Sequence, residues 1–405
     1  MTSDFPPRKA FGEDEQDAID DVVSYYRRSD EDPGYNGFFQ KQFEKDLAAF
    51  YGKGEAAAVN SGTNALYIAL CALNLKQGRE VIVSPVTDSG TVHAILAAGL
   101  VPVVADAAPG GYNTGLNQVT DCVTDLTAAV MLVHTAGEPV ADTEAIAKLC
   151  ENGAIPLIED VSQAMGANID GRLVGSFGTL AAGSMMYRKN LQCGGSGGFV
   201  YGVSPDLIKQ VMAYRDRGKQ PWRDDINQND PGTALFPALN HNFNEWGSAI
   251  ASASLKRLKR TNLDRLMFLY SLREKMQMAG CLSELQEFHS GYAPFYIPVW
   301  VPVKDKLGFA MRLKTKGIPL LEHYGCLVAD WLHIEKQVNW QPNHAYSEGH
   351  VPWSARSPNA RHTRDSTFNL FLNENYDIWH VRRIVSAIKE TETEMQEDLR
   401  ATPRK

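Results

Sequence analysis

The chain has 405 residues, of which 44% are hydrophobic and 22% charged, and its formal net charge is −8. That length is enough for a large buried core and a second, smaller lobe. The acidic balance argues against general nucleic-acid binding, which needs a basic face.

The first half of the chain predicts an α/β domain. Residues 1–40 form a polar leader around one amphipathic helix near 14–28. From residue 41 to about 204, helical segments alternate with short apolar runs at 56–59, 81–84, 101–105, 129–133, 156–159 and 198–201. Strands that are apolar on both faces and separated by helices indicate a mostly parallel sheet covered on both sides.

The last third of the chain predicts a smaller α+β domain. A polar stretch at 214–240 is too long for a simple connection, and such loops usually line sites or interfaces. A helix at roughly 245–279 follows, and then extended runs such as FYIPVWVPV mix with helices. One face of the last helix should pack on a core, because it carries Ile378, Val381, Ile384, Val385 and Ile388. We therefore expect a leader at 1–40, a large domain at 41–265 and a small domain at 266–405.

The cysteines and the hydropathy predict a cytoplasmic protein. The six cysteines are scattered without a CxxC pair, as is typical of a reducing compartment. The N-terminus lacks the apolar stretch of a signal peptide. No apolar run approaches the roughly 20 residues that a membrane span needs.

Two motifs stand directly after predicted strands. The segment 60–63 (Asn-Ser-Gly-Thr) opens a helix, where glycine and free backbone N–H groups favour an anion. The segment 159–163 (Glu-Asp-Val-Ser-Gln) puts Asp160 at the carboxyl end of a strand, where parallel sheets bind ligands. Each motif alone fits an ordinary capped turn at least as well.

A lysine and a helix start complete the candidate set. Lys189 follows an apolar run and precedes the glycine-rich stretch 194–198, whereas a lone lysine is normally a solvated surface charge. A partly buried lysine near other cations has a lowered pKa and can form imines. The segment 242–245 (Asn-Phe-Asn-Glu) opens the long helix, and by itself it is only a helix start.

The order and spacing of these pieces carry a family resemblance. The chain resembles the DegT/DnrJ/EryC1/StrS family of sugar aminotransferases, which have fold-type-I pyridoxal-phosphate architecture. The resemblance runs from about residue 43 to residue 243 and more loosely into the C-terminal helix. The segments that carry it are AAAVNSGTNALYIAL, VIVSPVTDSGTVHAI, MLVHTAGEPVADTEAI, PLIEDVSQAMGANIDGRLVGSFGT, SMMYRKN and LNHNFNEWGSAIA.

The resemblance implies a role for each matching residue. Lys189 would form the Schiff base with pyridoxal 5'-phosphate, and Asp160 would face the pyridinium nitrogen, so these two are the catalytic candidates. Gln163 would bond the phenolic oxygen of the cofactor. The phosphate would be held by Gly62, Thr63, Ser184 and, from the neighbouring subunit of a homodimer, Asn242. No metal site is assigned.

Several positions depart from the family pattern. Asp88 stands where many members have an aromatic residue stacked on the cofactor ring, and a carboxylate cannot stack. Met165 replaces a common histidine, Asn244 replaces the usual arginine, and no glutamate occurs in the glycine-rich stretch after Lys189. These departures concern the substrate class and leave the cofactor residues intact.

The resemblance implies transamination from an amino acid, by resemblance L-glutamate, to a keto-sugar, by resemblance nucleotide-linked. A cyclitol ketone as acceptor uses the same residues and stays open. Keto-sugar dehydration is disfavoured, because relatives that perform it have histidine in place of Lys189. A non-catalytic regulatory or assembly protein is the alternative of another class, and the intact Lys189 and Asp160 argue against it. We expect no nucleic-acid or membrane partner.

Overall fold

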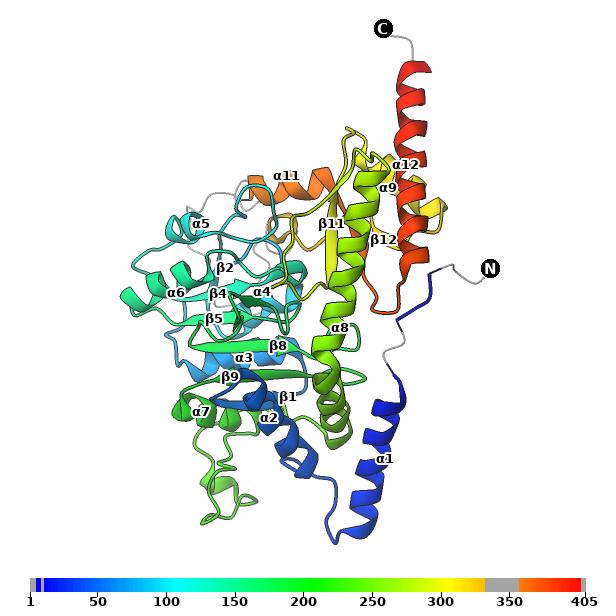
Figure 1. Ribbon diagram of the computed structural model, residues 1–405. Helices are drawn as coiled ribbons and strands as arrows, with labels where there is room; N and C mark the ends of the chain where they lie inside the picture. Colours follow the sequence, from blue (N-terminus) through cyan, green and yellow to red (C-terminus); the bar gives the residue numbers. More distant parts are fainter. Residues whose placement is uncertain (1–4, 9–10, 332–356, 402–405) are drawn as a thin grey trace.

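The computed structural model describes residues 5–8, 11–331 and 357–401, and a seven-stranded sheet forms its centre (Figure 1). The strand order is β1-β9-β8-β5-β4-β2-β3. The strands are β1 (Glu55–Val59), β2 (Glu80–Val83), β3 (Val101–Val104), β4 (Thr127–Val133), β5 (Leu157–Asp160), β8 (Leu180–Ser184) and β9 (Gly198–Gly202). Five neighbours, from β8 to β3, run parallel, and β9 runs antiparallel to β1 and β8.

The sheet confirms the predicted α/β class and its mostly parallel strands. Every predicted apolar run falls on a strand, whereas β8 was missing from the prediction. Its sequence LAAGS is made mainly of small residues, which have weak β propensity, so no alternation or β-branched run marked it.

Helices cover both faces of the sheet. On one face, α3 (Gly62–Ala72), α4 (Ser89–Ala97) and α7 (Pro205–Arg215) pack on side chains such as Val81 and Met131. The other face carries α2 (Phe38–Tyr51) and the first part of α8 (Glu245–Met278) over β1 and β9. On that same face, α5 (Leu116–Thr120) and α6 (Thr143–Asn152) cover β2 to β5.

The long helix α8 joins the N-terminal helices to the rest of the molecule. Helix α1 (Glu13–Arg28), predicted near 14–28, lies along α8 (Figure 1). Glu245, the first residue of α8, is buried, and its carboxylate accepts hydrogen bonds from the amides of Phe39 (2.9 Å) and Gln40 (2.9 Å). The carboxylate thereby satisfies free N–H groups in the first turn of α2. The predicted boundaries at residues 40 and 265 fall inside α2 and α8 and stay predictions.

A second, antiparallel sheet with its own core forms the smaller C-terminal part. Its order is β10-β11-β13-β12, from β10 (Glu284–Leu285), β11 (Tyr296–Trp300), β13 (Thr367–Phe371) and β12 (Leu320–Leu321). Helices α9 (Lys306–Thr315), α11 (Pro358–Ser366) and α12 (Ile378–Ala401) accompany it. The short β6 (Asn168–Ile169) and β7 (Arg172–Leu173) form a separate hairpin in the larger part.

One residue of the predicted apolar face of α12 is not buried. Val381, Ile384, Val385 and Ile388 lie in the core, as predicted, but the side chain of Ile378 is 47% exposed. It belongs to the first turn, where Trp379 is equally exposed, whereas His380 and Val381 of the same turn are buried. None of the helices in the described part of the chain combines the length and the hydropathy of a membrane span.

Candidate active site

The candidate residues gather at the carboxyl ends of the parallel strands. β1 leads into α3 at Gly62, β5 ends at Asp160, and β8 leads into the turn that carries Lys189. Farther along the sheet, beyond β4, β2 leads to Asp88 and α4. Segments that follow neighbouring parallel strands emerge at one edge of the sheet, where such folds bind ligands.

Lys189 sits in a tight turn after β8. Its amide donates a hydrogen bond to the carbonyl of Met186 (2.8 Å), and Tyr187 is joined in the same way to Gly195 (2.9 Å). The Nζ atom of Lys189 lies 4.7 Å from the ring centroid of Phe295. Burial lowers the pKa of Lys189, and the nearby carboxylates of Asp160 and Asp88 partly raise it again. A lysine with a lowered pKa has more of the neutral amine, which is the nucleophilic form.

Asp160 is buried and held from two sides. Its Oδ2 accepts a hydrogen bond from the hydroxyl of Thr91 (3.0 Å) and its Oδ1 from the amide of Ser162 (3.0 Å). Thr91 lies in the first turn of α4 and was not among the predicted site residues. Gln163 is also buried, and its Oε1 accepts from the amide of Ala136 (2.8 Å).

The N-termini of α3 and α4 meet beside Ser184. A Cβ atom added at Gly62 would lie 2.6 Å from the Cβ of Ser184, and one added at Gly90 would collide with the hydroxyl of Thr63. Thr63 itself is exposed at the start of α3. Two helix N-termini that converge on glycines and hydroxyls form a cradle suited to a phosphate group. Ser61 caps α3 at the same time, accepting from the amide of Asn64 (3.1 Å), so the capping interpretation and the anion interpretation are compatible.

Asp88 is the N-cap of α4. Its Oδ1 accepts a hydrogen bond from the amide of Gly90 (2.9 Å). The carboxylate is exposed, and it also acts electrostatically on Lys189. Asp88 therefore combines a structural role with an effect on the site.

Asn242 lies beside β1 of its own chain. It forms an isolated bridge with Val59, and its Nδ2 donates to Asn240 Oδ1 (3.0 Å). Its Oδ1 is buried and has no hydrogen-bond partner among the described residues. The single chain thus places Asn242 next to the strand that leads into α3 at Gly62.

The substituted residues Met165 and Asn244 have structural roles. Met165 is buried, and its sulfur lies 3.7 Å from the hydroxyl of Tyr51. Asn244 is the N-cap of α8, accepting from the amide of Gly247 (2.7 Å).

The smaller C-terminal part contributes residues that no motif indicated. The amide of Thr87 donates to the carbonyl of Cys326 (3.0 Å), and the amide of Val328 donates to the carbonyl of Pro85 (3.0 Å). These two hydrogen bonds fix the segment 326–328 beside the end of β2. Burial raises the pKa of the Cys326 thiol, the nearby Asp88 raises it further, and Lys189 lowers it. Such contacts join residues far apart in sequence, so no local signal could have revealed them.

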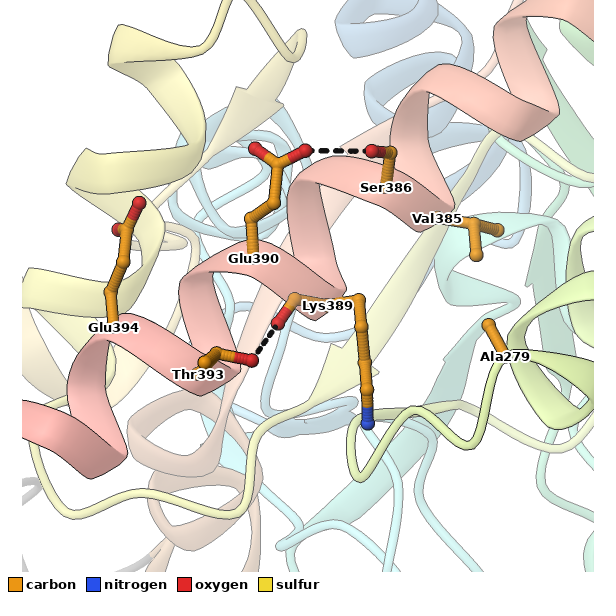
Figure 2. Close-up of a pocket in the computed structure, with 7 residues that line it drawn as sticks. All are labelled: Ala279, Val385, Ser386, Lys389, Glu390, Thr393 and Glu394. Carbon is orange, nitrogen blue, oxygen red and sulfur yellow. Dashed lines mark hydrogen bonds between the residues drawn. The ribbon is translucent and has the colours of Figure 1, made fainter.

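A surface hollow of about 510 Å³ lies away from this site (Figure 2). It is formed by the C-terminal end of α8 and one side of α12, and its lining is Ala279, Val385, Ser386, Lys389, Glu390, Thr393 and Glu394. None of the candidate site residues takes part in it. The chemistry is therefore to be sought at the sheet edge.

Comparison with known families shows which family this chain belongs to. The family model of the DegT/DnrJ/EryC1/StrS aminotransferase family matches residues 16–385. The chain belongs to this family. The family prediction is confirmed, and with it, at the level of the family, the prediction of an aminotransferase that uses pyridoxal phosphate.

Individual relatives show the range within this family. A UDP-N-acetyl-3-dehydro-alpha-D-glucosamine 3-aminotransferase of Acidithiobacillus ferrooxidans is 34% identical over 70% of this chain and 74% of its own length. A dTDP-4-dehydro-2,6-dideoxy-D-glucose 3-dehydratase of Saccharopolyspora spinosa is 31% identical over 68% of the chain and 62% of its own length. Matches to the first three curated relatives span only 50–62% of their lengths.

A solved structure shares the fold. The NtdA protein of Bacillus subtilis, with the cofactor PMP bound, has a TM-score of 0.81 at 20% identity, covering 97% of this chain and 86% of its own. The residues of the present site fit a phosphorylated pyridoxal cofactor. The cradle at Gly62 and Gly90 suits the phosphate, buried Asp160 suits a protonated ring nitrogen, and Lys189 offers the amine.

Proposed function

We propose that this protein transfers an amino group from an amino acid, L-glutamate, to a keto-sugar attached to a nucleotide. The observation that carries the proposal is the pairing of a lysine of lowered pKa with a buried carboxylate at one sheet edge. The relative from Acidithiobacillus ferrooxidans is named for the same kind of reaction on a UDP-sugar. The proposed site consists of Lys189 and Asp160 together with Gly62, Thr63, Gln163, Ser184 and Asn242.

The residues of this chain divide the work of such a reaction. Pyridoxal phosphate, when bound, supplies an aldehyde that condenses with amines and a ring that accepts electron density. When the Nζ amine of Lys189 is free of the cofactor and uncharged, it would take a proton from the carbon of the amino donor that bears the nitrogen. It would then donate this proton to another carbon atom of the reacting complex. The negative charge of Asp160, kept in place by Thr91 and Ser162, favours a protonated ring nitrogen. Gln163 is held by the amide of Ala136 and would orient the ring through its phenolic oxygen.

Two related reactions remain as alternatives. Dehydration is represented among the relatives, but lysine at position 189 favours amination. A cyclitol ketone would use the same residues as a keto-sugar. Incubation with glutamate and a panel of keto-sugar nucleotides and inososes, with products weighed by mass spectrometry, separates the three. Amination of inososes alone, or loss of water without gain of nitrogen, would contradict the proposal.

The assignment of Lys189 is tested by reduction with borohydride. The reduced protein, digested and mapped by mass, should carry the cofactor on the peptide that contains Lys189. Lys306 provides a matched control, because it is also buried, and burial lowers its pKa as well, while its Nζ donates to the carbonyl of Glu322 (2.8 Å). Lys189→Arg should abolish the label and the transamination, and Lys306→Arg should leave both. A label on any other lysine would overturn the assignment.

We further propose a homodimer in which Asn242 reaches the phosphate of the partner's site. Support comes from the family resemblance, and the group that would donate to the phosphate is Nδ2 of Asn242, which in the single chain donates to Asn240 Oδ1 (3.0 Å). The alternative arrangement is a site built from one chain only. It also has a structural basis, because Asn242 lies beside Val59 of its own chain.

Co-expression distinguishes the two arrangements. Asn242→Asp places a carboxylate beside a phosphate dianion and should release the cofactor, since like charges in contact repel. Lys189→Ala is inactive for a separate reason. If sites are shared, one site of each heterodimer is wholly wild-type, and activity returns. Heterodimers without activity would show that each site is self-contained.

The cytoplasmic location stays part of the proposal. All six cysteines are free, as a reducing compartment would keep them. Labelling by a thiol reagent in intact and lysed cells checks it.

A further inference from the structure

The N-terminal segment 5–8 is anchored on the smaller C-terminal part of the molecule. The side chain of Phe5 is 5% exposed and meets the ring of Tyr376 edge-on, with centroids 5.4 Å apart. The carbonyl of Pro6 accepts a hydrogen bond from Asn373 Nδ2 (3.0 Å). The segment is thereby fixed next to the loop that precedes α12.

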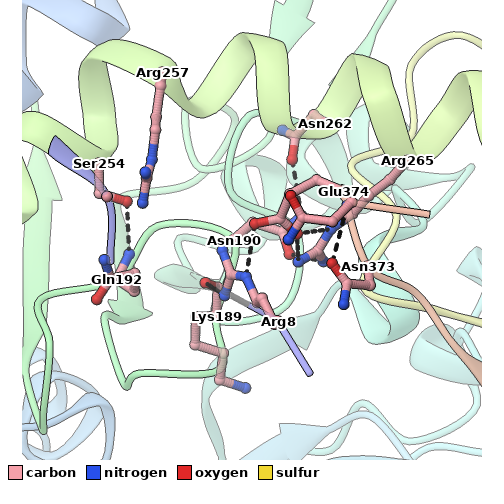
Figure 3. A network of polar contacts seen from close by, with 12 residues as sticks. Arg8, Lys189, Asn190, Gln192, Ser254, Arg257, Asn262, Arg265, Asn373 and Glu374 are labelled. Carbon is pink, nitrogen blue, oxygen red and sulfur yellow. Dashed lines mark hydrogen bonds and ion pairs between the residues drawn. The ribbon is translucent and has the colours of Figure 1, made fainter. Parts of the chain in front are cut away.

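Arg8, which ends this segment, connects that loop to the candidate active site (Figure 3). Its Nη1 donates to the carbonyl oxygen of Lys189 (2.6 Å), and its Nε to Glu374 Oε1 (2.8 Å). The second oxygen of Glu374 accepts from Arg265 Nη2 of α8 (2.8 Å). Arg265 Nη1 in turn donates to Asn190 Oδ1 (2.6 Å). One carboxylate thus holds both residues of the Lys189–Asn190 pair through two guanidinium groups.

This network fixes the backbone from which the lysine side chain extends. The amide of Lys189 is bonded to Met186 and its carbonyl to Arg8, so both sides of its Cα are held. Asn190 and Arg265 also donate to the carbonyl of Pro294, the residue before Phe295. Because the Nζ atom of Lys189 lies 4.7 Å from the centroid of the Phe295 ring, the same contacts position both the lysine and the ring it faces.

We propose that Arg8 is a positioning residue for Lys189, through which the N-terminal segment and the smaller C-terminal part hold the lysine in place. Hydrogen bonds from a charged guanidinium are stronger than neutral ones. Burial would raise the pKa of Glu374, but Arg265 and Arg8 hold it at about 2, so the carboxylate is charged near neutral pH. The proposal rests on the proposed function only for the role of Lys189 itself.

Hydrogen exchange in the cofactor-free protein tests the clamp without relying on activity. Arg8→Ala should speed exchange of the amides at 186–191 by about tenfold, as expected for losing one hydrogen bond to a charged group. For Arg8→Lys, which keeps a positive charge, the exchange rate at 186–191 should lie between those of the wild type and Arg8→Ala. Arg260→Ala is the control: it removes an exposed ion pair of α8, with Asp264 (2.8 Å), and should leave exchange at 186–191 unchanged.

Steady-state kinetics provides the second measurement. We expect kcat of Arg8→Ala to fall about tenfold, with KM for the amino donor changed less than about twofold, because the defect concerns the lysine and not donor binding. Unchanged exchange at 186–191, or exchange that rises evenly over the whole chain, would overturn the proposal, since Arg8 would then be an ordinary anchor. Faster local exchange without a change in kcat would instead count against the role of Lys189 in the proposed function. Arg8→Lys keeps the test decisive if Arg8→Ala does not fold.

Discussion

Replacing Glu374 by glutamine should cost about 3 kcal/mol of stability at pH 7, and this cost should shrink in acid. The side chain is 15% exposed and lies between Arg265, which is 1% exposed, and Arg8. The pKa of Glu374 is lowered from 4.5 to about 2: burial opposes the shift, and the two guanidinium groups overcome it. A difference of about 2.5 units corresponds to roughly 3 kcal/mol, close to the roughly 3–5 kcal/mol for breaking a buried ion pair.

The sign of the pH dependence follows from the direction of the shift. A carboxyl whose folded pKa is lowered stabilises the fold above its unfolded pKa, and this stabilisation is lost as the pH falls toward the folded value. Between pH 7 and pH 3.5, Glu374 should lose roughly 1.4 kcal/mol of its contribution. Glu374→Gln lacks the titrating group, so the difference between wild type and variant should decrease by that amount.

Urea unfolding of the cofactor-free protein at pH 7 and pH 3.5 measures this difference. Glu394→Gln is the matched control, because Glu394 also faces two cations, Lys316 (2.6 Å) and Arg312 (3.5 Å), but is 42% exposed. Its replacement should cost less than about 1 kcal/mol, as for surface pairs. Equal stability losses in the two variants, or a Glu374 effect that does not depend on pH, would contradict this prediction.

Three further changes test other parts of the site. Asp160→Asn should lower kcat about 100-fold or more while the protein still binds some cofactor; near-normal turnover would remove Asp160 from the catalytic residues. Asp88→Ser keeps a capping side chain but removes a negative charge that raises the pKa of Lys189. When acylation of Lys189 is measured against pH in the cofactor-free protein, its midpoint should therefore shift to lower pH, and an unchanged midpoint would contradict this. Asp88→Phe loses the cap and should cost about 1 kcal/mol in urea unfolding. Stronger cofactor retention in Asp88→Phe would show that the missing aromatic contact affects cofactor binding more than the loss of the cap does.

The sequence could predict those parts of the site that are local in the chain. The segment 60–63 follows β1 and Asp160 ends β5, so hydrophobic patterning and short motifs placed both at one sheet edge. Lys189 follows β8, which the patterning missed, and its role was given by the family resemblance. Phe295 and Arg8 could not be found in this way. Arg8 is 181 residues from the carbonyl it binds, and the ring of Phe295 is brought to Lys189 by the smaller C-terminal part. Periodicity likewise placed Ile378 on the same helical face as Val381 but could not show that Ile378, the first residue of the helix, stays exposed.

The neighbouring acids at the end of β5 show how one dipeptide can serve both structure and chemistry. Successive side chains of a strand point to opposite faces. Glu159 is fully buried and accepts hydrogen bonds from the amides of Gly175 (2.7 Å), Phe177 (2.7 Å) and Gly178 (2.6 Å). It thereby fixes the loop that leads into β8 and, through β8, the turn of Lys189. Asp160, turned the other way, meets Thr91 of α4. The carboxylate that we propose to face the cofactor is therefore placed by the same strand whose other carboxylate fixes the loop before β8. Moving either acid by one residue would exchange their faces.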